Sequence, residues 1–107
     1  MKIYLMNTTI LTSPGIWEMK SISLAEAKKI IQDNVEIVVS AIGHESTAKL
    51  LTNVLQIDVP VNRIQARQGT EDIAICFKLN GRIQEGMVLD LETIKKIGYE
   101  FFKIRHY

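Results

Sequence analysis

The stretch VEIVVSAIGHESTAKLL, residues 35–51, joins an apolar run to a helical pattern through a single glycine. Residues 35–42 are mostly apolar and end at Gly43, which predicts a strand buried on both faces in the middle of a sheet. After the glycine, residues 50–55 carry an apolar stripe at helical spacing. The stretch therefore predicts a strand that leads directly into a helix, as in α/β proteins.

The other segments supply further strands and helices. Residues 2–6 are rich in β-branched and aromatic side chains, which predicts a first strand. Ser23 and Glu26 have the spacing of a capping box, so a helix is expected to begin there. Two strand-like segments, residues 61–68 and 72–79, are separated by a short turn sequence and predict a hairpin.

The C-terminal third predicts one more helix and one more strand. Asp90 is suited to cap a helix that ends at Gly98, and residues 99–107 read as a final strand. Residues 8–21 are interpreted as a loop. With no linker or repeat in the sequence, we expect residues 1–107 to form one α/β domain, a mixed β-sheet flanked by about three helices.

Composition narrows the class of protein. Thirteen basic and twelve acidic side chains give a net charge of +1, which argues against binding of long duplex DNA through many phosphates. The sequence has no apolar run near the eighteen or so residues that a membrane helix needs. The single cysteine, Cys76, excludes a disulfide within one chain and is expected to be a buried thiol. A cytoplasmic protein is the resulting expectation.

The segment GHEST, residues 43–47, has the features of an anion site. The first amides of a helix point outward without partners and favour a phosphate. Gly43 lets the backbone approach a ligand closely, and Ser46 and Thr47 add hydroxyl donors in the first turn. His44 would then stand beside the phosphate. A purely structural interpretation stays open, in which the glycine makes the bend, a hydroxyl caps the helix and the imidazole is solvated.

A second polar group lies in GRIQEG, residues 81–86. Arg82 can hold a phosphate with two parallel hydrogen bonds, and Glu85 can orient an imidazole. The alternative is a solvated turn with an ordinary surface ion pair. Arg63 and Arg67 also lie near a predicted strand end, where a solvated role is expected for each taken alone.

Metal ligands are scarce in the sequence. Two histidines and one cysteine, far apart along the chain, do not make a closed zinc site, and no paired carboxylates of the two-metal type are evident. We therefore expect any phosphate chemistry to proceed without a metal or another cofactor.

Four stretches together carry a resemblance to a known family. KIYLMNTT, IGHESTAKLL, NRIQ and RIQEGMVLDLETI occur in an order and at a spacing similar to those of the type III anti-CRISPR ring nucleases. These are small proteins of archaeal viruses and bacterial mobile elements. The similarity spans nearly the whole chain, and Gly-His-x-Ser-Thr followed by Arg-x-x-Glu-Gly is more specific than either motif alone.

The resemblance implies a homodimer that binds cyclic tetra-adenylate and cuts it to linear di-adenylate without a metal, countering type III CRISPR signalling. It matches His44 to the catalytic histidine of the family. It also matches four residues to the ligand site, Asn7, Arg63, Arg82 and Glu85. We expect Arg82 and Glu85 to take part in catalysis beside the histidine, and Gly43, Ser46 and Thr47 to contact the ligand.

The chemistry of RNA fits these residues. The 2′-hydroxyl is a built-in nucleophile, so a protein that aligns it with the 5′-leaving group needs mainly an acid, and His44 is the candidate. Arg82 and the helix amides would stabilise charge on the phosphate. A ring of four identical nucleotides can have two-fold symmetry, so a homodimer would offer it two equivalent sites.

Two other functions stay open. One is a cyclic-nucleotide-binding module that sequesters the ring without cutting it. The other is a small dimeric interaction or regulatory protein of a mobile element, whose expected basic recognition helix is missing from the three predicted helices. If the protein is viral, the host-cell cytoplasm is its expected location.

Several conspicuous side chains are expected to be structural. Phe77, Phe101 and Phe102 are interpreted as core or dimer-interface residues. Trp17 is interpreted in the same way, with a base-stacking role left open for it. His106, next to the C-terminus, is expected to be exposed.

Overall fold

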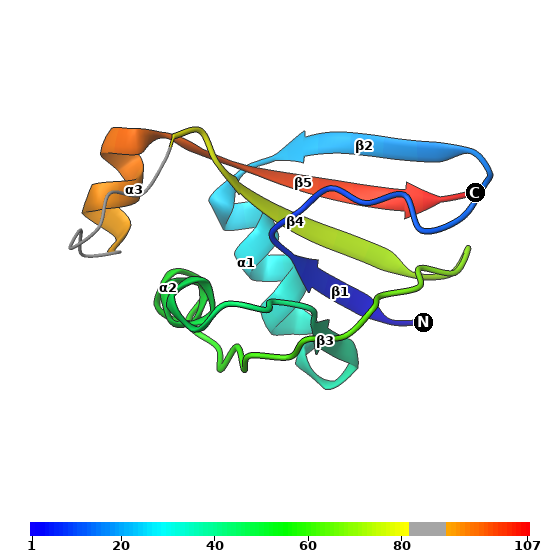
Figure 1. The fold of residues 1–107 in the computed structure, drawn as a ribbon, viewed down its shortest axis with the longest axis horizontal. Helices are drawn as coiled ribbons and strands as arrows, with labels where there is room; N and C mark the ends of the chain where they lie inside the picture. Colours follow the sequence, from blue (N-terminus) through cyan, green and yellow to red (C-terminus); the bar gives the residue numbers. More distant parts are fainter. Residues whose placement is uncertain (82–89) are drawn as a thin grey trace.

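Five strands form one mixed sheet in the order β2-β5-β4-β1-β3 (Figure 1). The computed structural model describes residues 1–81 and 90–107. Its strands are β1 (Ile3–Met6), β2 (Trp17–Ile22), β3 (Val38–Ser40), β4 (Ile73–Leu79) and β5 (Tyr99–His106). β1 is parallel to β3 and β4, whereas β5 is antiparallel to β4 and β2. The mixed sheet expected from the sequence is confirmed.

The described residues form three α-helices, α1 (Leu24–Asp33), α2 (Glu45–Leu55) and α3 (Leu91–Ile97). The Ser23 hydroxyl accepts a hydrogen bond of 3.1 Å from the Glu26 amide at the start of α1, as the capping box predicts. The Asp90 carboxylate accepts one of 2.8 Å from the Thr93 amide at the start of α3. Hydrogen bonds from the Thr93 side chain and backbone hold the pKa of Asp90 below its usual value. These helix starts and the three-helix expectation are confirmed.

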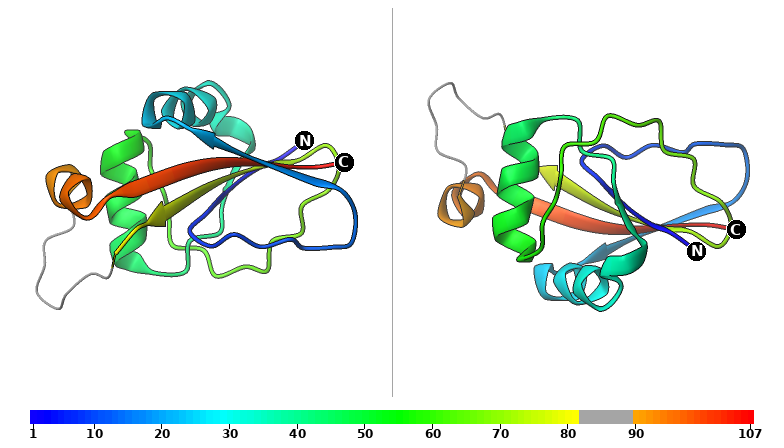
Figure 2. Two further views of the ribbon diagram at one scale, coloured as in Figure 1. Left: turned by 90° about the horizontal axis from the view of Figure 1, so that it is seen from above. Right: turned by 90° about the horizontal axis from the view of Figure 1, so that it is seen from below.

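The two faces of the sheet are covered differently. In β1, Ile3 and Leu5 belong to the core that includes residues of α1 and α2, whereas Tyr4 and Met6 belong to a second cluster with Cys76. Figure 2 shows α1 on one face and the chain segments after β1 and before β4 on the other. The second face is therefore covered by irregular segments, and this is where the site described below lies.

The apolar run 35–42 was predicted as a central strand, and this prediction is wrong. Residues Val35–Ile37 form a turn of 3-10 helix, and β3 is a three-residue strand at the edge of the sheet. Val35 is 54 % exposed. An apolar run alone does not distinguish a central strand from a turn followed by a short edge strand.

The predicted hairpin is also wrong in its first half. β4 forms within the second segment, but residues 61–68 are not a strand. β4 is already paired with β1 on one side and β5 on the other, so no edge of it is left for a further strand. The Gln68 amide donates instead to the Thr12 hydroxyl, at 3.0 Å.

Most of β2, residues 17–21, falls in the stretch 8–21 that was interpreted as a loop. It pairs along its whole length with β5, from Trp17 opposite His106 to Ile22 opposite Phe101. Its exposed charged residues, such as Lys20, concealed the alternation typical of a strand. The loop proper is therefore limited to the residues before β2.

Candidate functional site

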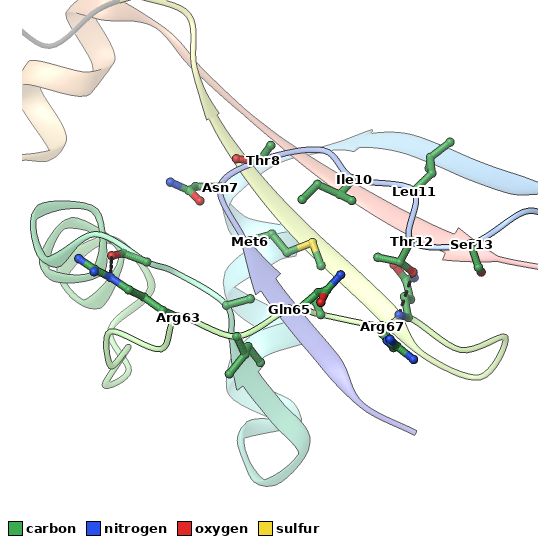
Figure 3. A pocket seen from close by; sticks show the side chains of 15 residues that line it. Met6, Asn7, Thr8, Ile10, Leu11, Thr12, Ser13, Arg63, Gln65 and Arg67 are labelled. Carbon is green, nitrogen blue, oxygen red and sulfur yellow. Dashed lines mark hydrogen bonds between the residues drawn. The ribbon is translucent and has the colours of Figure 1, made fainter.

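A groove of about 880 Å³ opens on the face of the sheet away from α1. One wall comes from the end of β1 and the segment after it, residues 6–8 and 10–13, and the other from residues 63–68, which precede β4 (Figure 3). Gly43 also lines the groove, and the Arg63 side chain bonds its carbonyl oxygen. Met6 and Ala66 contribute apolar surface to it. Segments far apart in the sequence thus meet over the second cluster of the core.

The charged side chains among the described lining residues of the groove are all positive. Its lining includes Arg63 and Arg67 and, among the described residues, no aspartate or glutamate. Both arginines are exposed. The ion pairs found within residues 1–81 and 90–107 join Lys20 to Glu18 and Lys49 to Glu45, so they involve neither arginine. A hollow with guanidinium groups and no carboxylate suits an anionic ligand.

Both walls are tied to the sheet beneath them. The Tyr4 hydroxyl donates to the carbonyl oxygen of Arg67 at 3.2 Å. On the other wall, the Thr9 hydroxyl lies 3.6 Å from the Cys76 sulfur. Burial raises the pKa of the Cys76 thiol, so it stays protonated at neutral pH, and the buried thiol expected from the sequence is confirmed. These contacts hold the irregular walls in place.

His44 is the N-cap residue of α2 and directly follows the glycine that lines the groove. Its carbonyl oxygen accepts the first helical bond, from the Ala48 amide at 3.0 Å. Its side chain is exposed and makes no capping hydrogen bond. Exposed Ser46 and half-buried Thr47 lie in the first turn. His44 itself does not line the groove; it and the free first amides of α2 follow Gly43, the lining residue at one end of the groove, directly along the chain.

Residues 62 and 63 fasten the turn between β3 and α2. Asn62 donates from its side chain to the carbonyl oxygen of Ser40 and from its amide to that of Ile42, both at 2.8 Å. The Arg63 Nε donates to the carbonyl oxygen of Gly43 at 2.9 Å. The guanidinium of Arg63 is thereby held beside the glycine, with its other N–H groups left for a ligand.

The structure brings together most of the site residues expected from the sequence. Three of them line the groove, Asn7, Gly43 and Arg63. Three more belong to the adjacent start of α2, His44, Ser46 and Thr47. Arg82 and Glu85 lie outside the described residues.

Arg67 was treated in the sequence as an ordinary solvated residue, and Gln65 was not considered. Both line the groove. A signal was present in the alternation of residues 65–68, where exposed Gln65 and Arg67 alternate with Ala66 and Gln68, which are less exposed. The wrong assignment of this segment to a hairpin concealed its role.

His106 was expected to be exposed, and this is wrong. The residue is only 9 % exposed, its ring stacks on that of Trp17 with 4.1 Å between centroids, and Nδ1 lies 3.2 Å from the carbonyl oxygen of Gln68. The pairing of β2 with β5 continues to His106, which brings Trp17 over it. Phe77 and Phe101 are core residues as expected. Trp17 and Phe102 are partly buried against the second cluster.

Within the described ranges, no three His, Cys, Asp or Glu side chains are grouped so that they can hold a metal ion. None of the helices in those ranges is long and apolar enough to cross a membrane.

Comparison with known proteins places the chain among viral and bacterial relatives. It is 34 % identical to protein 26 of Sulfolobus islandicus filamentous virus over 105 residues, which cover 94 % of this chain and 87 % of the relative. It is 36 % identical to protein ORF117 of Acidianus two-tailed virus over 107 residues, covering 96 % and 92 %. It is 34 % identical to YddF of Bacillus subtilis over 102 residues, covering 95 % and 94 %.

The fold is also similar to a solved one. B116 of Sulfolobus turreted icosahedral virus (STIV) superposes with a TM-score of 0.86 over 98 % of this chain and 99 % of that one, at 22 % identity. The model of the STIV B116-like family matches residues 3–101. This chain therefore belongs to the STIV B116-like family of small proteins.

Proposed function

We propose that the protein is a metal-independent ring nuclease that binds cyclic tetra-adenylate at a homodimer interface and cleaves it to linear di-adenylate. The observation that carries this proposal is the groove. It combines two arginines with no carboxylate among its described lining residues, and Gly43 at its end directly precedes exposed His44 and the N-terminus of α2. Such a groove fits a polyanion, and the imidazole fits acid catalysis on it.

The reaction uses the nucleophile that the RNA carries. The 2′-oxygen attacks the adjacent phosphorus while its proton passes to solvent, and the bond from phosphorus to the 5′-oxygen breaks. His44 gives a proton to that 5′-oxygen, so the products carry a 2′,3′-cyclic phosphate and a 5′-hydroxyl. A positioned acid contributes about 10² to 10⁴ in rate, and alignment and charge stabilisation supply the rest.

The roles of the remaining site residues follow from their positions or from the family resemblance. Arg63 is held beside Gly43 and grips a phosphate with its free N–H groups. The start of α2 adds backbone amides to the same phosphate. Arg82 and Glu85 keep the catalytic roles that the resemblance implies, charge stabilisation and orientation of the imidazole.

Pairing of two copies matches the symmetry of the ligand. A ring with two-fold symmetry can present equivalent linkages to the two histidines of an isologous dimer, so each ring is cut twice. Four large apolar residues that are each more than half exposed lie in and after the first wall of the groove along the chain, Ile10, Leu11, Ile16 and Met19. Contiguous exposed apolar surface is typical of protein interfaces. These residues support an association of protomers near the groove.

The relatives agree with a role in genetic conflict. Two of them are proteins of archaeal viruses, and a third is bacterial, as expected for a gene carried by viruses and mobile elements. We propose that the protein acts in the cytoplasm of the infected or host cell, where removal of cyclic tetra-adenylate would silence type III CRISPR signalling.

The decisive experiment is to incubate the purified protein with cyclic tetra-adenylate in EDTA and to separate the products by chromatography. Linear di-adenylate with a cyclic phosphate end is expected for wild type but not for His44→Ala. Asn53→Ala is the matched control, because it removes an exposed polar side chain from the same helix outside the groove. A ring that is bound but stays intact with wild type would contradict the enzyme and favour the sequestering module.

A further inference from the structure

We infer that the end of the groove around Arg67 is a second phosphate subsite, so that each protomer grips two phosphates of one oligonucleotide. This inference rests on the proposed function, which places the cleaved linkage at the other end, beside Gly43 and His44. It adds a residue that selects for ligands with more than one phosphate.

Arg63 and Arg67 lie at opposite ends of the groove and therefore contact different phosphates. Figure 3 shows the side chains of Arg63 and Arg67 at opposite ends of the groove, with Gln65 between them. A bidentate arginine–phosphate contact requires N···O distances of about 2.7–2.9 Å. Because the Arg63 guanidinium is tied to the carbonyl oxygen of Gly43, it does not swing toward the other end. One phosphate therefore does not satisfy both guanidinium groups.

The surroundings of Arg67 are those of an anion site. Thr12 and Ser13 line the opposite wall. The Thr12 hydroxyl oxygen already accepts from the Gln68 amide, so its hydrogen remains free to donate to a ligand. As along the rest of the described lining, no carboxylate is present here to repel a phosphate.

The backbone under Arg67 is fixed before any ligand binds. Its carbonyl oxygen accepts the hydrogen bond from Tyr4, which is a residue of the interior strand β1 and is 6 % exposed. The next residue, Gln68, is buried and donates its side-chain amide to the carbonyl oxygen of Ile104 at 2.8 Å. A preorganised position of this kind loses less conformational entropy on binding than a free surface arginine does.

The arrangement suits an oligonucleotide backbone. The exposed row of Arg63, Gln65 and Arg67 can follow successive sugar–phosphate units, while Met6 and Ala66 offer apolar surface to sugar or base faces. Positively charged grooves that track the backbone are how single-stranded nucleic acids are bound without strong base preference. A mononucleotide, with one phosphate group, occupies only one of the two subsites.

The test measures binding without turnover. The probe is a cyclic tetra-adenylate with 2′-deoxyriboses, which lacks the attacking hydroxyl, titrated calorimetrically into wild type and Arg67→Ala. Loss of the arginine is expected to weaken binding roughly ten- to a hundredfold. It should also reduce the salt dependence of binding by about one ion per subsite. Adenosine 5′-monophosphate should lose much less affinity than the ring, because the Arg63 subsite remains for its single phosphate.

Two further variants separate the subsite from general charge. Arg67→Lys keeps the charge but not the fork and should bind the ring with intermediate affinity. Lys29→Ala removes an exposed cation from α1, outside the groove, and should bind as wild type does. The melting temperature of Arg67→Ala should not change, because Tyr4 bonds the backbone of residue 67 and not its side chain.

The outcomes distinguish this inference from the proposed function. Unchanged ring binding and cleavage by Arg67→Ala would overturn the second subsite and leave the ring nuclease standing. Equal weakening of ring and mononucleotide binding would also overturn it, because a general charge effect would then be at work. Failure of wild type to bind the ring at all would overturn the proposed function itself.

Discussion

The two faces of the sheet are covered by different kinds of structure, helices on one face and irregular segments on the other. On the helix side, Ile3, Leu5 and Ile75 are fully buried in a core shared with α1 and α2. On the other side, Tyr4 and Cys76 lie beneath irregular segments that leave a groove between them. Regular helices cover apolar surface completely, whereas irregular segments need individual hydrogen bonds and leave room for a ligand. The main core and the candidate ligand groove therefore lie on opposite faces of one sheet.

The largest expected effect is a loss of activity without a loss of stability. His44→Ala should lower the turnover of cyclic tetra-adenylate by about 10² to 10⁴, because it removes the proton donor for the leaving oxygen. The melting temperature should not fall, since the side chain is exposed and makes no capping bond. Single-turnover kinetics and calorimetry check both parts. Full activity of this variant would show that another group supplies the proton.

Leu51→Ala should destabilise the core on the helix-covered face of the sheet. Leu51 is completely buried in the core at α2, so truncation leaves a cavity and should lower the free energy of unfolding by about 2–5 kcal/mol. Denaturant unfolding measures this loss. At temperatures where the variant stays folded, ring binding should be within about threefold of wild type. Loss of binding by a folded variant would show that the two faces are coupled.

Asn62→Ala should loosen the turn between β3 and α2. It removes the side-chain hydrogen bond to the carbonyl oxygen of Ser40 and leaves a largely buried acceptor without that partner, at a cost of about 1–3 kcal/mol. We expect kcat to fall more than ring affinity, because the turn that carries Gly43 and His44 loosens. Asn62→Asp, which keeps the shape but loses the donor, should resemble the alanine variant. Normal kcat in both would exclude a positioning role.

The smallest effects sharpen the comparison. Tyr4→Phe removes the bond to Arg67 and Ser23→Ala removes the cap of α1, and each should lower stability by about 1 kcal/mol. Only Tyr4→Phe should also weaken ring binding, because it releases a wall of the groove. Parallel unfolding and binding titrations check the pair. Equal binding by both variants would mean that the wall needs no anchor from the sheet.

Local sequence signals predicted the elements whose ends are determined by nearby residues. The caps at Ser23 and Asp90 mark the starts of α1 and α3 because a capping bond spans only three residues. Local signals do not decide whether residues 35–42 form a central strand or whether residues 61–68 form the first strand of a hairpin. Their outcome depends on which sheet edges are free, and that is decided by β1 and β5.

The sequence also predicted part of the candidate site. The turn at Gly43 and His44 lies within one local segment, and the family resemblance added Asn7 and Arg63. Arg67 was missed because the residue that fixes it, Tyr4, lies 63 positions away in the sequence. His106 was misjudged because its cover, Trp17, comes from the opposite end of the chain.

The position of β1 has a consequence for how the chain folds during synthesis. β1 lies between β3 and β4, and its residue Ile3 is in register with Ile73. β1 can pair with β3 early, but its second partner, β4, emerges about seventy residues after it, and β4 in turn needs β5. The sheet is complete only after β5 has been synthesised, so fragments that lack β5 should be captured by chaperones or degraded.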